Sequence, residues 1–330
     1  MTEPVRAASI GVGWWGKELA RAAAATGQIE IVSCYARTPE KCDEFSAALG
    51  CRTAPDLQSV LSDDDVEAVL VATSHSSHRQ IVEEAASAGK HVFMEKPFTL
   101  TVDDARAAVD AAAKGRIVLQ VGHQRRRLAA HRAMHRMIAE GEIGDIQMLE
   151  ANHSLPNGFT MADEAWRRNA EESPLGSITS LAIHQVDNFL YLAGPIARVA
   201  AVTRPGRAFT IDEATGLLLE FSSGAVGTLL TSFFTPWNIR LALHGTEGAA
   251  FTVDDGAVLE FQVRGERERR IRALPQVDPV VDQLEEFARV VRQSGRPEVG
   301  GEEALAVVAV LEAAVEAARS GCFIEVANGR

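Results

Sequence analysis

Three glycines near the start of the chain have the spacing of a phosphate-binding turn. Gly11, Gly13 and Gly16 lie between the apolar segment 6–10 and the Ala-rich segment 14–26. In a GxGxxG turn the first glycine permits the tight bend, the second lets a pyrophosphate reach the backbone, and the third lets helix and strand approach. The helix start adds free N–H groups and a positive dipole end. Because this context disfavours a glycine-rich turn without a ligand, we predict a dinucleotide site made by Gly11, Val12, Gly13, Trp14, Trp15 and Gly16.

The end of the next apolar segment, 29–34, bears on which nicotinamide dinucleotide binds. Folds that prefer NAD usually have an acidic residue here, which holds the ribose 2′-hydroxyl. This chain instead has Ala36, Arg37 and Thr38. An arginine beside a small residue and a hydroxyl can bind a 2′-phosphate through charge-assisted hydrogen bonds. We predict NADP(H) as the preferred cofactor, with NAD(H) as the alternative if Arg37 is an ordinary surface charge.

A charged pair, Glu95 and Lys96, ends a later apolar segment over 90–94 and is followed by Pro97. In a parallel sheet, cofactor and substrate meet at the carboxyl ends of the strands. A solvated ion pair would be the better interpretation of an isolated Glu-Lys-Pro segment. The glycine turn at the start of the same sheet favours a functional role instead.

These residues lie in a regular alternation of strand and helix patterns that extends to residue 123. Such alternation predicts βαβ units and a Rossmann-type parallel sheet. At 330 residues the chain exceeds the size at which a single core usually stops growing, so we expect two domains, the first over 1–123. Strands are expected over 6–10, 29–34, 67–72, 90–94 and 116–121, and helices over 14–26, 39–48, 77–88 and 101–113.

The remainder, 124–330, has a different pattern. A helix is expected over 128–140, and short strands separated by turns then predominate, which indicates a mostly antiparallel open sheet. Returning helical periodicity predicts helices on one face, with the other face left for a partner. The expected strands are 145–154, 196–204, 214–222, 225–234, 238–244, 249–253 and 257–263, and the expected helices are 184–192, 280–293 and 302–318.

Six segments, in order and spacing, resemble the Gfo/Idh/MocA family, the glucose-fructose oxidoreductase and inositol dehydrogenase group. They are GVGWWG at 11–16, VATSHSSH at 71–78, AGKHVFMEKP at 88–97, GHQRRR at 122–127, GEIGDI at 141–146 and IHQVDNFLYLAGP at 183–195. The resemblance covers nearly the whole chain. It implies a dinucleotide-binding domain followed by a domain for substrate binding and oligomerisation, whose exposed sheet face makes the contacts of a homodimer or homotetramer. It also implies cofactor contacts by Thr73, His75, His78, Glu95 and Lys96.

The resemblance further implies catalytic residues. Lys96 would lie by the nicotinamide and the substrate, where its charge could stabilise a developing alkoxide. His184 would be the acid/base, because imidazole titrates near working pH. Asp187 lies three residues later on the same helical face and would contact substrate. The alternative for Asp187 is a structural role at the start of the helix.

The chain departs from this family four residues before His184. Sugar and polyol dehydrogenases of the family usually have an acid there, whereas this chain has Ser180. The change leaves a sugar or cyclitol possible and also admits a carboxylated, aromatic or hemiacetal substrate. We predict substrate contacts by Ser180, and by Trp166 and Arg167 if their loop recognises an anion. A charged surface loop, which also contains Arg168, is the alternative.

The other histidines and the cysteines give weaker indications. His131 and His135 share a helical face without a glutamate in HExxH spacing, so a solvated face is expected rather than zinc. His153 ends a predicted strand and could line a cleft or cap the sheet edge. The cysteines lack CxxC spacing and are expected to be reduced packing residues, without a metal. They are Cys34, Cys42, Cys51 and Cys322.

Composition limits the partners. A formal net charge of -12 and an aromatic fraction of 6% argue against nucleic acid and anionic membranes. An apolar run of roughly 20 residues is missing, as is a basic, apolar leader, so we expect a cytoplasmic protein. We predict an NAD(P)-dependent dehydrogenase or reductase for a small molecule. The alternative is a dinucleotide-sensing regulatory protein, because the family includes a repressor that binds the cofactor without turnover.

Overall fold

A computed structural model of the chain describes residues 3–162, 165–206 and 210–327. The chain forms two compact units, which we treat separately. Unit 1 contains residues 1–124 and 278–305, and unit 2 contains 125–277 and 306–330. Among the helices in the described ranges, none combines the length and apolar character needed to cross a bilayer.

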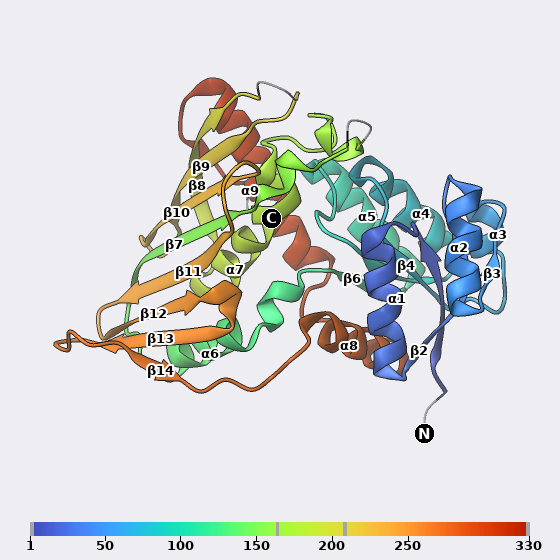
Figure 1. Ribbon diagram of the computed structural model, residues 1–330, viewed down its shortest axis with the longest axis horizontal. Helices are drawn as coiled ribbons and strands as arrows, with labels where there is room; N and C mark the ends of the chain where they lie inside the picture. Colours follow the sequence, from blue (N-terminus) through green and yellow to red (C-terminus); the bar gives the residue numbers. More distant parts are fainter. Residues whose placement is uncertain (1–2, 163–164, 207–209, 328–330) are drawn as a thin grey trace. The chain divides into compact units, whose positions relative to one another are not determined.

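Unit 1 is built on a six-stranded parallel sheet in the order β3-β2-β1-β4-β5-β6, so the predicted Rossmann-type sheet is confirmed. The sequence missed β3, because two residues are too few to produce a recognisable alternation. The strands are β1 (Val5–Ile10), β2 (Ile29–Tyr35), β3 (Arg52–Thr53), β4 (Ala68–Val71), β5 (His91–Met94) and β6 (Leu119–Val121). The helices between them are α1 (Trp14–Thr26), α2 (Pro39–Leu49), α3 (Leu57–Leu61), α4 (His78–Ser87) and α5 (Val102–Gly115) (Figure 1).

A late helix, α8 (Pro279–Gln293), completes the core of unit 1. Its buried Leu284 and Phe287 join the same apolar cluster as Leu19 of α1, and the Phe287 ring meets Phe93 of β5 edge to face at 5.8 Å. The predicted second domain, 124–330, includes this helix. Its amphipathic pattern shows that one face is buried but not against which sheet.

Unit 2 contains a nine-stranded sheet in the order β14-β13-β12-β11-β7-β10-β9-β8-β15. Every neighbouring pair is antiparallel except β7 and β10, which confirms the predicted, mostly antiparallel sheet. The strands are β7 (Ile146–Ser154), β8 (Ile196–Arg204), β9 (Ala214–Phe221), β10 (Val226–Ser232), β11 (Asn238–Gly245), β12 (Gly248–Val253), β13 (Val258–Val263), β14 (Arg270–Arg272) and β15 (Ile324–Glu325).

Helices α6 (Ala129–Ala139) and α7 (Ile183–Ala193) lie against one face of this sheet (Figure 1). Helix α9 (Gly301–Ser320) starts within unit 1 and continues in unit 2 from residue 306. The opposite face of the sheet exposes apolar side chains on the two strands that flank β9. Val202 of β8 is 77% exposed and Leu230 of β10 is 56% exposed, and both pair in register with Gly216 of β9.

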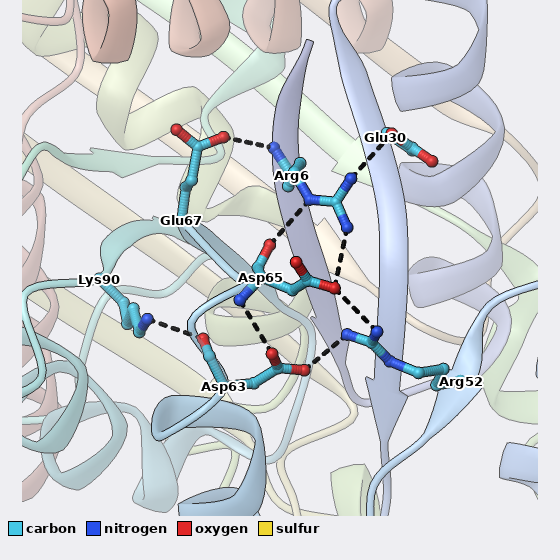
Figure 2. Close-up of polar contacts among 7 residues, drawn as sticks. All are labelled: Arg6, Glu30, Arg52, Asp63, Asp65, Glu67 and Lys90. Atoms are coloured by element: carbon cyan, nitrogen blue, oxygen red, sulfur yellow. Dashed lines mark hydrogen bonds and ion pairs between the residues drawn. The ribbon is translucent and has the colours of Figure 1, made fainter.

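Charged side chains cross-link the amino-terminal edge of the sheet in unit 1 (Figure 2). Arg52 on β3 bonds both Asp63 and Asp65, at 2.6 and 2.9 Å, and Arg6 on β1 also reaches Asp65. Lys90 donates to the Asp63 carbonyl at 2.9 Å. The side chains at the amino ends of these strands thus bond to one another. Ligands of parallel sheets bind at the carboxyl ends of the strands.

Three cysteines pack together between β2 and α2. Cys34, Cys42 and Cys51 are free and buried, whereas Cys322 is exposed. Burial raises the pKa of the Cys34 thiol to about 12. A thiol that holds its proton this firmly is a poor nucleophile, so this cluster contributes packing rather than chemistry.

Candidate active site

Gly11 lies where the carboxyl ends of β1, β2 and β4 meet. Its N–H donates to the Tyr35 carbonyl at 2.8 Å, and Ala72 donates to the Ile10 carbonyl at 2.8 Å. The φ of Gly11 is +90°, and a Cβ there would lie 2.3 Å from the Ala72 oxygen. A larger residue would strain the backbone and displace the end of β4, so the turn requires glycine.

The start of α1 is shaped to receive an anion. A Cβ on Gly16 would lie 2.0 Å from the Gly11 oxygen, so the helix begins directly against the turn. A Cβ on Gly13 would meet no atom of the described residues within 4 Å, which leaves this backbone approachable. Among the residues that the structure describes, none in the first turn of α1 is acidic. These features fit the pyrophosphate of a dinucleotide.

The two tryptophans of the turn differ in environment. Trp14 is 74% exposed, and its ring lies 5.3 Å from that of the partly buried Trp15. Trp15 packs against the apolar core of unit 1, and Trp14 extends toward solvent. Cofactor contact by either ring stays a prediction.

Ala36, Arg37 and Thr38 connect β2 to the start of α2. The Thr38 carbonyl accepts from Lys41 and Cys42 at 3.2 and 3.3 Å, so Thr38 begins the helix. The side chain of Arg37 is exposed and makes no hydrogen bond or ion pair within the part of the chain that the structure describes. A guanidinium at a helix start is therefore available for an anion.

The loop after β4 brings the predicted Thr73 next to the glycine turn. A Cβ on Gly11 would lie 3.2 Å from Thr73 Cγ2, and Thr73 Oγ1 and Ser77 Oγ are 2.8 Å apart. His75 and His78 are buried, with ring centroids 5.8 Å apart. The structure thus groups these predicted residues at one edge of the sheet.

The Glu95–Lys96 segment continues the same edge from β5. Glu95 donates its N–H to the Val71 carbonyl at 3.0 Å, which aligns the segment with the end of β4. Glu95 is 5% exposed and Lys96 is half-buried. The residue after β6, Gly122, donates to the Met94 carbonyl at 2.8 Å.

In unit 2, His184 lies in the first turn of α7 and is 5% exposed. A π-helical turn, Ile178–Ala182, precedes it directly, so helical backbone begins before the predicted start at 184. The sequence did not reveal this turn because its residues are nearly all buried and lack an amphipathic period. Ser180 lies in it, with Oγ 3.4 Å from Ser173 Oγ. Single π-turns often occur at functional sites.

The structure places a second histidine beside His184. His153 on β7 is 4% exposed, and its ring lies nearly parallel to that of His184 with centroids 6.4 Å apart. Thr231 on β10 donates to the His153 carbonyl at 2.6 Å and holds this strand. The sequence left His153 open between cleft and sheet edge, because no local pattern shows which helix residue packs on a strand.

Asp187 is engaged by an arginine. Arg126 donates from Nε and Nη2 to the two Asp187 carboxylate oxygens at 2.8 and 2.7 Å, and both side chains are buried. The Arg126 guanidinium also lies 5.0 Å from the centre of the Tyr191 ring. This bidentate pair joins α7 to the segment before α6. Substrate contact by Asp187 stays a prediction.

One histidine prediction on α6 is wrong. His131 is 1% exposed, not solvated, and its Nδ1 lies 2.7 Å from the Arg125 carbonyl. Burial, with the nearby Arg125 charge, lowers the pKa of His131 to about 4, so the ring is neutral. His135 is exposed as expected and stacks on Tyr191 at 4.3 Å.

Trp166 and Arg167 lie in a short turn, Trp166–Arg168. The Arg167 guanidinium lies 4.2 Å from the centre of the Trp166 ring, and Arg167 is exposed. Thr210 donates to the Arg168 carbonyl at 2.6 Å and anchors the turn. A substrate role for Trp166 and Arg167 stays a prediction.

Known families match both units. Residues 5–123 match the oxidoreductase family with an NAD-binding Rossmann fold, and residues 131–251 match the GFO/IDH/MocA C-terminal domain. The chain belongs to the Gfo/Idh/MocA family. It is thus an NAD(P)-dependent oxidoreductase acting on CH–OH or carbonyl groups. The predicted family resemblance is confirmed.

Relatives in the Gfo/Idh/MocA family match over most of their length. The chain is 29% identical to the 1,5-anhydro-D-fructose reductase of Ensifer adhaerens, over 91% of this chain and 92% of the relative. It is 30% identical to the 4-carboxy-2-hydroxymuconate-6-semialdehyde dehydrogenase of a Sphingobium species, over 69% and 72%. A crystal structure from Desulfitobacterium hafniense, described as a proposed NADPH-dependent oxidoreductase, superposes with a TM-score of 0.93 at 30% identity over 99% of each chain.

Proposed function

We propose that the protein transfers hydride between NADP(H) and a small hydroxylated or carbonyl compound, with His184 as acid/base and Lys96 assisting. One observation carries the proposal. The glycine turn, the Arg37 loop, the Thr73 loop and the Lys96 segment all follow carboxyl ends of one parallel sheet. This is the edge at which cofactor and substrate meet in such sheets.

The side chains have separate tasks in the proposed reaction. A nicotinamide cofactor held at the glycine turn would supply the acceptor for a hydride from a carbinol carbon, or the donor of a hydride to a carbonyl carbon. His184 takes the hydroxyl proton in oxidation and gives it back in reduction. The Lys96 ammonium stabilises the negative charge that develops on the substrate oxygen. The ring of His153 lies beside that of His184, with centroids 6.4 Å apart, and is the aromatic neighbour of the acid/base in unit 2.

The preference for NADP(H) depends on Arg37. Arg37→Ala should raise the Kd for NADPH about 10- to 100-fold, because one charge-assisted hydrogen bond contributes roughly 1.5–3 kcal/mol. The Kd for NADH should change little, because NADH has no 2′-phosphate. Titration of cofactor fluorescence measures both constants. The matched control is Arg106→Ala, because Arg106 is an exposed arginine on α5. Tighter binding of NADH than of NADPH by the unaltered protein would contradict the preference.

Ser180 bears on which class of substrate the protein accepts. Its hydroxyl bonds Ser173 and supplies no carboxylate beside His184. The two named relatives act on an anhydro-sugar and on a carboxylated semialdehyde, which supports testing both classes. The experiment is an absorbance screen at the reduced-nicotinamide band against sugars, cyclitols, anhydro-sugars and carboxylated aldehydes. Turnover of one class supports the proposal. Tight NADPH binding without turnover across the panel favours a dinucleotide sensor, the second candidate that Ser180 permits.

We also propose that the open face of the sheet in unit 2 joins copies of the chain. Exposed Val202, Leu230 and Trp237 line one hollow and form an apolar surface of the kind that marks interfaces. Light scattering coupled to size-exclusion chromatography measures the molar mass of the protein, which should be that of a dimer or tetramer. Leu230→Glu should shift it toward the monomer, because a buried unpaired charge opposes association. Leu49→Glu, at an exposed leucine of unit 1, should leave the mass unchanged. A monomeric unaltered protein would contradict this interface.

A further inference from the structure

The backbone around Lys96 is held on both sides. On the amino side, Glu95 Oε2 accepts the Lys96 N–H at 3.3 Å. On the carboxyl side, His78 Nδ1 lies 3.0 Å from the Pro97 oxygen and 3.2 Å from the Phe98 oxygen. The path of the chain on each side of the Lys96 side chain is therefore set by these two residues.

The contacts of His78 with the Pro97 and Phe98 carbonyls fix which ring nitrogen carries the hydrogen. It is the first residue of α4 and is 0% exposed. Carbonyl oxygens only accept hydrogen bonds, so Nδ1 must carry the hydrogen and donate it. The donor is shared between the carbonyls of Pro97 and Phe98, the two residues that follow Lys96. A buried ring in a fixed tautomer restrains this segment.

The loop that leads into His78 is itself bonded internally and contacts the glycine turn. Ser77 Oγ donates to the Ser74 carbonyl at 2.7 Å and lies 2.8 Å from Thr73 Oγ1. Thr73 lies beside Gly11, as described above. His78 thus connects the loop beside the cofactor turn to the segment that contains Lys96.

The other side of the Lys96 segment depends on space left by Gly122. A Cβ on Gly122 would lie 2.6 Å from Glu95 Oε1 and 3.3 Å from the Phe93 ring. Glu95 is buried, so its carboxylate has little freedom to move away. A residue larger than glycine at position 122 would displace the carboxylate that accepts the Lys96 N–H.

We propose that His78 is a positioning residue for Lys96. It ties the loop at the cofactor turn to the carbonyls after Lys96 and so sets the ammonium relative to nicotinamide and substrate. His78 acts through its neighbours, because its ring is fully buried and bonded to backbone. The inference rests on the proposed catalytic role of Lys96 and goes beyond the sequence prediction of a cofactor contact.

The test compares two substitutions of His78 in the full-length protein. His78→Leu removes the donor and should lower kcat on the order of 10²-fold, the effect of a misplacement of about 1 Å. KM and the Kd for NADPH should stay near their wild-type values. His78→Asn should restore much of kcat, because an amide N–H can take the place of the Nδ1 hydrogen. The readouts are kcat, KM, the Kd for NADPH and the thermal unfolding midpoint.

His91→Leu is the matched control, because His91 Nδ1 accepts the Val118 N–H at 2.9 Å at the opposite end of β5. It should lower the unfolding midpoint and leave kcat unchanged. If His78→Leu gives this same pattern, or His78→Asn restores nothing, the positioning role is wrong. Should His78→Leu fail to fold, His78→Phe, which keeps a ring but has no Nδ1 donor, takes its place, and an unchanged kcat would overturn the proposal. Full activity of Lys96→Ala would instead reject the proposed function itself.

Discussion

Replacing His184 with alanine should lower kcat roughly 10²- to 10⁴-fold, the range supplied by a general acid/base. Lys96→Ala should lower kcat roughly 10²- to 10³-fold, as expected for the loss of one group that stabilises the developing oxyanion. Both variants should largely keep the wild-type affinity for NADPH, because the glycine turn and Arg37 are unaltered. Steady-state kinetics and cofactor titration measure these constants.

A control for the His184 result is His135→Ala. His135 is an exposed histidine of the same unit that stacks on Tyr191. Its removal should leave kcat close to the wild-type value. Wild-type rates in both Lys96→Ala and His184→Ala would show that neither side chain takes part in the reaction. A loss of kcat accompanied by a large rise in the Kd for NADPH would point to a damaged cofactor site instead.

Breaking the buried Arg126–Asp187 pair should cost about 3–5 kcal/mol of unfolding free energy, because Asp187→Ala removes both carboxylate acceptors of a buried guanidinium. Both side chains are at most 7% exposed, so bulk water hardly reaches the guanidinium or the carboxylate. Chemical denaturation of the two proteins measures the change in unfolding free energy, taken from the transition that reports on unit 2. Activity should also fall, because Asp187 lies one helical turn from His184.

An exposed pair in the same unit provides the comparison. Arg198 and Glu220 bridge β8 and β9 at 2.6 Å, and both side chains are at least 40% exposed. Glu220→Ala should change the unfolding free energy by about 0–1 kcal/mol. If Asp187→Ala costs no more than Glu220→Ala, the buried pair does not hold α7 in place.

Local sequence patterns predicted the two sheets but not every element of the architecture. The glycine turn, the apolar strand runs and the helical periodicities predicted the parallel sheet and the mostly antiparallel sheet, because each of these depends on residues close together in the chain. The same patterns missed β3, which is two residues long. They also could not show that α8 returns to pack against Phe93, since a helical period carries no information about its partner.

Interactions between residues far apart in the chain could not be predicted from the sequence. Asp187 was identified as a candidate, but its bidentate partner Arg126 lies 61 positions away. The sequence does not assign a role to His153, because its stacking on His184 depends on how α7 packs against β7. His78 was predicted at the cofactor edge, whereas its bonds to the carbonyls after Lys96 depend on how the loops of two strands meet.

The most direct test of the central claim is transfer of a labelled hydride. The protein is incubated with NADPH that carries deuterium at both C4 positions of the nicotinamide and with the carbonyl compound that gives turnover, or with the full carbonyl panel if none does. Mass spectrometry then follows the label. We predict one deuterium on the new carbinol carbon, and almost none with the His184→Ala protein. Tight binding of labelled NADPH without transfer to any compound would contradict the enzymatic account and favour the sensor.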